Sequence, residues 1–212
     1  MEYYRQQTNI NMPPAVKYLL LLNIFVFLTQ MLLPKGLGVW FDRTFALHYP
    51  AVGGMTVVQL FSYMFLHGGF SHLFFNMFAL WMFGRIVEYD LGSKRFFGYY
   101  LTCGVGAGII QLLVNYIEFG GLPYPVVTVG ASGAVFGLLL AYGMMHPNNV
   151  VMLMFPPIAL KAKWFVVIYG VLELLGGVAS VGSNVAHFAH LGGMIFGFVL
   201  LRYWKKTNKI WY

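Results

Sequence analysis

Apolar residues are arranged along this chain in long runs that short polar segments separate. A helix needs about 20 mainly apolar residues to cross the hydrocarbon core of a bilayer, and six segments approach or reach that length. The pattern therefore predicts an all-α fold, a polytopic bundle of six transmembrane helices. The predicted spans are Val16–Leu33, Phe70–Val87, Phe96–Glu118, Ala131–Met145, Trp164–Val181 and Val185–Trp204.

The apolar run over residues 57–83 is too long for one comfortable crossing. Gly68 and Gly69 interrupt it, and paired glycines disfavour the continuation of a helix. We therefore expect a short interfacial helix over Val57–Leu66, with the second span beginning at Phe70.

Basic residues distinguish the two sides of this predicted bundle. With the N-terminus inside, the inner segments hold Arg5, Lys17, Arg85, Lys94, Arg95, Lys161, Lys163, Arg202, Lys205, Lys206 and Lys209, and the outer segments hold Lys35 and Arg43. An excess of Lys and Arg marks the cytoplasmic side. The sequence thus predicts a cytoplasmic segment over 1–15, one membrane domain over 16–204 and a basic cytoplasmic tail over 205–212.

Composition supports the membrane class and excludes others. Hydrophobic residues make up 59% of the 212 and charged residues only 9%, against about 25% charged residues in a soluble domain. The net charge of +7 does not indicate nucleic-acid binding, because the basic residues lie at span ends rather than in one patch. Cys103 is the single cysteine, so the chain has neither an internal disulfide nor a thiolate cluster, and we interpret this cysteine as structural.

Several polar residues share one depth near the outer side of the predicted bundle. Ser132 opens the fourth span, His190 lies near the outer start of the sixth, and His72 and Asn76 lie near the outer start of the second. Hydrogen-bonding residues inside a bilayer are costly and usually functional. The fourth span is also short, about 22 Å at 1.5 Å per residue, so its first residue can lie below the membrane surface.

Glycines at a spacing of four mark the faces on which two of these helices approach. Gly133 and Gly137 lie in the fourth span, and Gly193 and Gly197 lie in the sixth. Small residues at this spacing allow helix backbones to pack closely in lipid. Such packing would bring the Ser132 hydroxyl within reach of the His190 imidazole.

A hydroxyl beside an imidazole indicates nucleophilic catalysis, in which the imidazole accepts the hydroxyl proton and returns it to the leaving group. His72 and Asn76 are four residues apart on one helical face, and both can donate hydrogen bonds to a developing oxyanion. The backbone N–H of Ser132 adds a donor at a helix N-terminus. No acid clearly completes a triad. Glu173, in the middle of the fifth span, is interpreted mainly as a structural group, and a Ser–His dyad is predicted.

Four segments resemble motifs of the rhomboid intramembrane serine proteases. GASG at 130–133 is similar to the family's GxSG nucleophile motif, and AHLGGMIFG at 189–197 fits AHxxGxxxG. HGGFSHLFFN at 67–76 looks like the family's second-span segment, and EYDLGS at 88–93 is a weaker likeness. This resemblance extends from the first loop to the end of the sixth span. The four motifs together are more specific than any one of them alone, because they occur in the same order as in the family.

The resemblance implies Ser132 as nucleophile and His190 as general base. It implies His72, Asn76 and the Ser132 amide as oxyanion donors, and Phe136 as the aromatic residue that packs on the catalytic histidine, where some relatives carry tyrosine. Reading His187 as the motif histidine would place the motif glycines on His190 and Met194, so His190 is chosen. The implied activity is cleavage of transmembrane segments of other membrane proteins near the outer face, without a cofactor, in a bacterial inner membrane.

Other interpretations of these residues remain. A serine near a helix start is more often a cap or an interhelical hydrogen bond. His72, His187 and His190 could gather around zinc, although no HExxH motif and no carboxylate lie among them in the sequence. A transporter is disfavoured, because the spans show no inverted repeat. The alternative kept is a catalytically inactive rhomboid-like binding or quality-control factor. The sequence indicates no oligomeric state.

The fifth span carries further glycines, Gly170, Gly176 and Gly177. We interpret this span as a candidate moving gate beside the second span, through which a substrate helix would enter.

Overall fold

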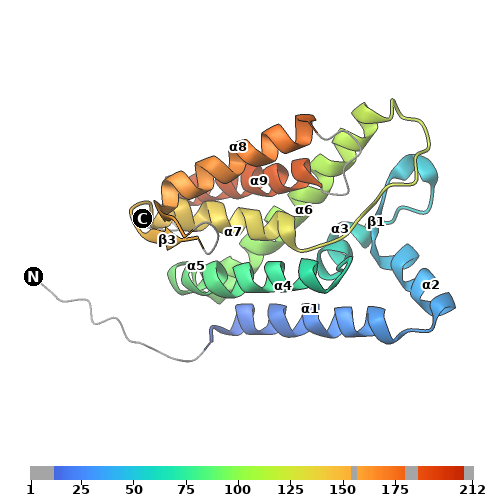
Figure 1. Ribbon diagram of the computed structural model, residues 1–212, viewed down its shortest axis with the longest axis horizontal. Helices are drawn as coiled ribbons and strands as arrows, with labels where there is room; N and C mark the ends of the chain where they lie inside the picture. Colours follow the sequence, from blue (N-terminus) through green and yellow to red (C-terminus); the bar gives the residue numbers. More distant parts are fainter. Residues whose placement is uncertain (1–11, 154–156, 180–185, 208–212) are drawn as a thin grey trace, which may run out of the picture.

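A computed structural model describes residues 12–153, 157–179 and 186–207 of the chain. Each predicted span corresponds to a helix, and these helices form one bundle (Figure 1). The second span is a continuous helical rod in which α4 passes through a π-helical turn, η3, into α5. The bounds are α1 Pro14–Leu32, α4 Phe70–Ala79, η3 Leu80–Gly84, α5 Arg85–Leu91, α6 Ser93–Glu118, α7 Ser132–Met145, α8 Ala162–Ala179 and α9 His187–Lys206.

Four helices in the described ranges are long and apolar enough to cross a membrane: α1, the α4–α5 rod, α6 and α8. At 14 residues, α7 is shorter, about 21 Å at 1.5 Å per residue, as the sequence predicts. The 20-residue α9 is more polar, because two histidines open it and basic residues close it. The predicted bundle of polytopic helices is confirmed, with α7 and α9 held in it by packing against their neighbours.

The ends of several elements differ from the sequence prediction. α1 begins at Pro14 rather than Val16, because proline suits the first helical turn, where its missing N–H is not needed. α8 is described to Ala179 and α9 from His187, so the predicted ends of the fifth and sixth spans at 181 and 185 lie outside the described residues. The same holds for most of the predicted terminal segments, 1–15 and 205–212.

The connections contain short elements, most of which the hydrophobic pattern did not predict. The predicted interfacial segment is present as α3 and η2, beginning two residues later than expected. The amphipathic helix α2 and two small antiparallel ladders, β1–β2 and β3–β4, were missed. Their bounds are α2 Lys35–Phe45, β1 Leu47–His48, η1 Pro50–Val52, α3 Gln59–Ser62, η2 Tyr63–Phe65, β2 Val127–Thr128, β3 Val150–Met152 and β4 Ala159–Lys161.

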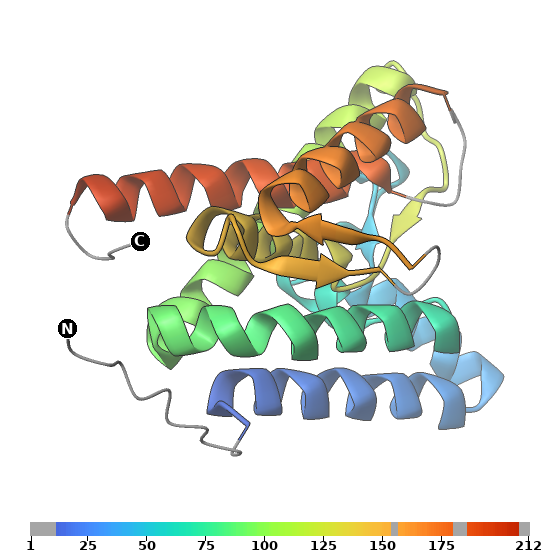
Figure 2. The same ribbon diagram turned by 60° about the vertical axis from the view of Figure 1, so that its left-hand side comes forward.

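α7 lies in the centre of the bundle, between the α4–α5 rod on one side and α8 and α9 on the other (Figure 2). Glycines allow this close arrangement. A Cβ on Gly193 of α9 would collide with the carbonyl group of Gly133 in α7, and one on Gly137 would collide with buried Cys103 of α6. One on Gly197 would collide with Tyr99 of α6. The backbones of α7 and α9 are therefore in direct contact, as small residues permit in lipid.

Glu88 holds helices together at the end of the bundle that lies opposite Ser132. Its carboxylate is 2% exposed and accepts hydrogen bonds from the N–H groups of Ala15 (2.9 Å) and Val16 (2.7 Å) and from the Ser93 hydroxyl (2.6 Å). An acid at a helix N-terminus satisfies free N–H donors and complements the helix dipole. Glu88 therefore joins α1 to the junction of α5 and α6, which explains the acid of the EYDLGS segment.

Replacing Gly193 by alanine should lower the free energy of unfolding by about 1–3 kcal/mol, the usual cost of overpacking. Denaturation of the purified protein in mixed micelles measures this. Gly98→Ala in α6 is the matched control, because a Cβ there meets nothing within 4 Å. Equal losses of stability in the two variants would contradict the assigned backbone contact.

Glu88→Gln should destabilise the fold by roughly 1–3 kcal/mol, because one amide oxygen cannot accept all three hydrogen bonds and buried donors lose their partners. Glu118→Gln serves as control, since Glu118 is an exposed residue at the end of α6. The same micelle denaturation compares the two, and a Glu88 variant as stable as the Glu118 variant would refute the anchoring role.

Candidate active site

The loop that precedes Ser132 is fixed by backbone hydrogen bonds. β2 pairs with β1, with Leu47 opposite Thr128, and the Gly130 N–H donates to the carbonyl of Tyr63 at 2.9 Å. Gly130 has φ 121°, a conformation that side chains rarely adopt, and a Cβ there would lie 2.7 Å from the His72 imidazole. Glycine at position 130, two residues before the serine, is thus required both by the backbone conformation and by the space that the His72 ring occupies.

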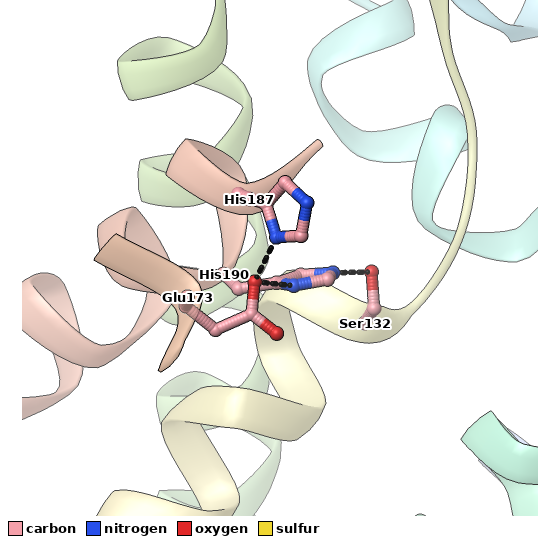
Figure 3. Close-up of polar contacts among 4 residues, drawn as sticks. All are labelled: Ser132, Glu173, His187 and His190. Carbon is pink, nitrogen blue, oxygen red and sulfur yellow. Dashed lines mark hydrogen bonds and ion pairs between the residues drawn. The ribbon is translucent and has the colours of Figure 1, made fainter. Parts of the chain in front are cut away.

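Ser132 and His190 are brought together from α7 and α9. The Ser132 Oγ lies 2.8 Å from His190 Nε2, and Figure 3 shows the hydroxyl pointing at the imidazole edge. The pair lies beside the Gly133–Gly193 backbone contact, which sets the separation of the two helices. His190 is 9% exposed, whereas Ser132 is half-buried. A hydroxyl in hydrogen-bond contact with an imidazole is the arrangement that nucleophilic catalysis requires.

Phe136 holds the plane of the His190 ring. It lies one turn after Ser132 on α7, and the two rings stack with centroids 4.3 Å apart and an interplanar angle of 6°. The stacking leaves the two imidazole nitrogens free to bond at the ring edge. The sequence placed Phe136 at this position through the family resemblance.

Glu173 of α8 lies in the same cluster, a position that sequence reasoning did not assign. Its Oε2 is 2.8 Å from His190 Nδ1 and 2.7 Å from His187 Nδ1. Both contacts end on the same carboxylate oxygen (Figure 3). The Ser–His pair is therefore extended by a carboxylate. The signal available in the sequence was a single acid inside an apolar span, which must face a polar partner.

The imidazole of His72 lies beside Gly130, two residues before the serine. The Gly68 N–H points at His72 Nδ1 over 3.4 Å, which makes Nδ1 an acceptor and leaves the hydrogen on Nε2. That Nε2 lies against Gly130, next to Ser132. Asn76 is 6% exposed, and its amide donates to the carbonyl of His72, one turn back in its own helix, at 2.9 Å.

Ser132 also presents a backbone donor, since it is the first residue of α7. The N–H groups of the first helical turn have no acceptor within the helix. The position of a Cβ on Gly130 lies 2.7 Å from His72 Nε2 and 3.8 Å from Ser132 Oγ, so α4 and α7 each bring a donor to the space beside Gly130.

The ligand atoms of Glu173, His187 and His190 lie within 4.8 Å of one another. The zinc alternative from the sequence proposed His72, His187 and His190 without a carboxylate, but the structure groups two of these histidines with Glu173 and places His72 beside Gly130. Zinc holds its ligand atoms at about 2.0–2.2 Å, which separates them by roughly 3.3 Å in a tetrahedron. The observed separations of 2.7 and 2.8 Å instead fit direct hydrogen bonds.

The remaining histidines have separate surroundings. His67 is 3% exposed and packs edge-on against His72 with centroids 5.1 Å apart. Burial, with the neighbouring His72, lowers the pKa of His67 to about 4, so its ring is neutral at physiological pH. His146 pairs with Asp90 at 2.6 Å, and His48 lies in β1.

Known proteins similar to this chain carry the family name that the motifs suggest. Residues 55–206 match the Rhomboid domain. The chain is 30% identical over 194 residues to the putative rhomboid protease YdcA of Bacillus subtilis, covering 92% of this chain and 90% of that protein. It is 35% identical over 140 residues to rhomboid protease GluP of the same organism, covering 66% of this chain and 24% of GluP.

A further relative is the mitochondrial Rhomboid protein 1 of Saccharomyces cerevisiae. The identity is 30% over 140 residues, which covers 66% of this chain and 40% of the yeast protein. The family domain spans most of the chain, and the likeness to YdcA spans nearly all of both proteins. Together with the apolar helices of the bundle, these matches establish that this integral membrane protein belongs to the rhomboid family.

Proposed function

We propose that this protein is an intramembrane serine endopeptidase that cleaves transmembrane segments of other membrane proteins near the outer membrane face. The observation that supports this most directly is the 2.8 Å contact between Ser132 Oγ and His190 Nε2 inside a membrane bundle. The alternative, a catalytically inactive binding or quality-control factor, is less well supported. Such a protein would not need a hydroxyl and an imidazole in hydrogen-bond contact.

His190 acts as general base in the first step. Its Nε2 takes the proton of the Ser132 hydroxyl while Oγ attacks the scissile carbonyl carbon and a tetrahedral intermediate forms. The C–N bond then breaks as Nε2 returns the proton to the leaving amine. Water then attacks the carbonyl carbon of the acyl-enzyme while His190 Nε2 accepts a proton from it. The bond to Ser132 Oγ breaks as Nε2 gives that proton to Oγ, which regenerates the hydroxyl.

The oxyanion of the intermediate is stabilised by donors that already lie near Ser132. The backbone N–H of Ser132 and the Nε2–H of His72 are the first two. Asn76 is the third proposed donor, and its amide has a second hydrogen besides the one given to the His72 carbonyl. Donors held rigidly where charge develops lower the barrier without reorganisation.

The substrate we propose is a single-span protein whose helix is weak near its outer end. Backbone groups of a helix are satisfied internally, and opening them in lipid costs several kcal/mol per group, so helix-breaking residues near the cut lower the barrier. Water must reach Ser132 from the outer side. The partial exposure of Ser132, His72 and Glu173 supports such access.

We further propose a bacterial inner membrane with both termini in the cytoplasm. The start of α1 and the end of α9 lie at the same end of the bundle (Figure 1), which also holds most of the basic residues. Positive charge is typical of the cytoplasmic side. The α7 helix begins at Ser132, and its start lies toward the opposite end of the bundle (Figure 1), next to η2.

Ser132→Ala should abolish labelling by a fluorophosphonate probe and cleavage of a single-span reporter with a helix-breaking residue near its outer end. Alanine has no nucleophilic atom, so the loss should be complete while the unfolding midpoint is retained. Ser71→Ala, which removes an exposed hydroxyl of α4, is the matched control. Labelling at another residue, or undiminished cleavage by the Ser132 variant, would overturn the nucleophile assignment.

His190→Ala should reduce the rate of reporter cleavage by at least about 10²-fold, because general acid–base catalysis contributes roughly 10²–10⁴. His187→Ala leaves the imidazole that touches Ser132 in place and should retain measurable cleavage. Comparing initial rates at equal amounts of folded protein separates the two histidines. Cleavage that survives only in the His190 variant would reverse their assignment.

A further inference from the structure

Glu173 makes two hydrogen bonds that the Ser–His mechanism above does not use. A carboxylate accepts hydrogen bonds and donates none, so the 2.8 Å contact requires the hydrogen on His190 Nδ1. In a neutral imidazole the other nitrogen is then bare. That nitrogen, Nε2, is the one that lies 2.8 Å from the Ser132 hydroxyl.

We propose that Glu173 is a positioning residue for the reaction, so that the site works as a Ser132–His190–Glu173 chain rather than as a dyad. Its carboxylate selects the imidazole form with a basic Nε2 and directs that nitrogen at the serine. This inference rests on the proposed protease function and extends the site to a third helix, α8.

The surroundings of Glu173 support this role. α8 is an apolar span that mostly faces outward. Only 17% of its 18-residue apolar stretch is buried inside the protein, against 44% of the corresponding stretch in α6. The neighbours Leu172 and Leu174 are exposed, whereas the Glu173 side chain is only 14% exposed and faces α9. An acid is costly in such a helix unless it is paired, and both of the described hydrogen bonds of this carboxylate go to the histidine pair of α9.

His187 keeps the carboxylate in place. Its Nδ1 donates to the same oxygen at 2.7 Å. Two glycines of α8 admit the aromatic rings that open α9: a Cβ on Gly176 would lie 2.8 Å from the His187 ring, and one on Gly177 would lie 2.8 Å from the Phe188 ring. Gly176 and Gly177, two glycines of the span interpreted as a gate from the sequence, therefore allow α8 to lie close to α9.

The proton balance of the proposed step is simple. The Ser132 proton moves to His190 Nε2, and the Nδ1 hydrogen stays on the ring, which becomes an imidazolium. The negative carboxylate stabilises this cation without taking a proton. The imidazolium becomes neutral again when Nε2 gives its proton to the leaving amine.

The test compares Glu173→Gln with wild type in the full chain purified in detergent, with Glu118→Gln as a matched exposed control. Three quantities are measured: the second-order rate of fluorophosphonate labelling at Ser132, kcat and KM for the single-span reporter, and the ¹⁵N NMR signals of labelled histidine, with His190 assigned from the His190→Ala spectrum. Thermal unfolding reports the fraction folded.

We expect Glu173→Gln to lower the labelling rate and kcat by roughly 100-fold or more while KM changes less than about threefold. The His190 signals should change from a single Nδ1–H form in wild type to a mixture of both tautomers. The Glu118 variant should match wild type in all three measurements.

Three results would overturn this inference without touching the proposed protease function. The first is a labelling rate per folded molecule that is unchanged in Glu173→Gln, and the second is a wild-type His190 that carries its hydrogen on Nε2. The third is lower stability with unchanged kcat, which would mean that Glu173 only holds α8 against α9. A wild-type protein whose Ser132 is not labelled at all, while His190 shows the Nδ1–H form, would instead refute the proposed protease function.

Discussion

The contact between the backbones of α7 and α9 at Gly133 and Gly193 determines the geometry of the site. Neither residue has a side chain, so the helices approach until a Cβ on Gly193 would overlap the Gly133 carbonyl. Dispersion and close packing drive helix association in lipid, where there is no hydrophobic force between helices. Because Ser132 directly precedes Gly133 and His190 lies one turn before Gly193, this packing sets the distance between hydroxyl and imidazole.

Around this contact, each reactive group is held by a different part of the fold. The loop before Ser132 is tied to β1 and to Tyr63, the ring of His190 is stacked on Phe136, and Glu173 reaches in from α8. The opposite end is fastened by Glu88. The helix that carries Glu173 is also the one with the lowest buried fraction among the four apolar spans, so the position of α8 and the orientation of the base are physically linked.

The sequence predicted what depends on composition and local motif. The helical segments follow from apolar length, the break at Gly68-Gly69 from glycine, and the short α7 from its residue count. It did not predict Glu173 beside His190, because helical periodicity tells which face of a helix is polar but not which neighbour it meets. Nor did it predict the hydrogen bonds of Glu88 or the β1–β2 ladder, because these depend on how loops far apart in sequence meet in space. α2 was not predicted because it is an amphipathic helix of 11 residues, whose interrupted apolar pattern is far shorter than a membrane span.

The most direct test of the central idea, that Ser132 and His190 form one reactive centre within the bundle, is an experimental structure of the protein after reaction with a fluorophosphonate. The account predicts phosphorus bonded to Ser132 Oγ, with the phosphoryl oxygen facing the Ser132 N–H and His72 and with His190 still beside the serine oxygen. A structure in which the two side chains lie on separate faces of the bundle, or in which the probe is attached elsewhere, would contradict it.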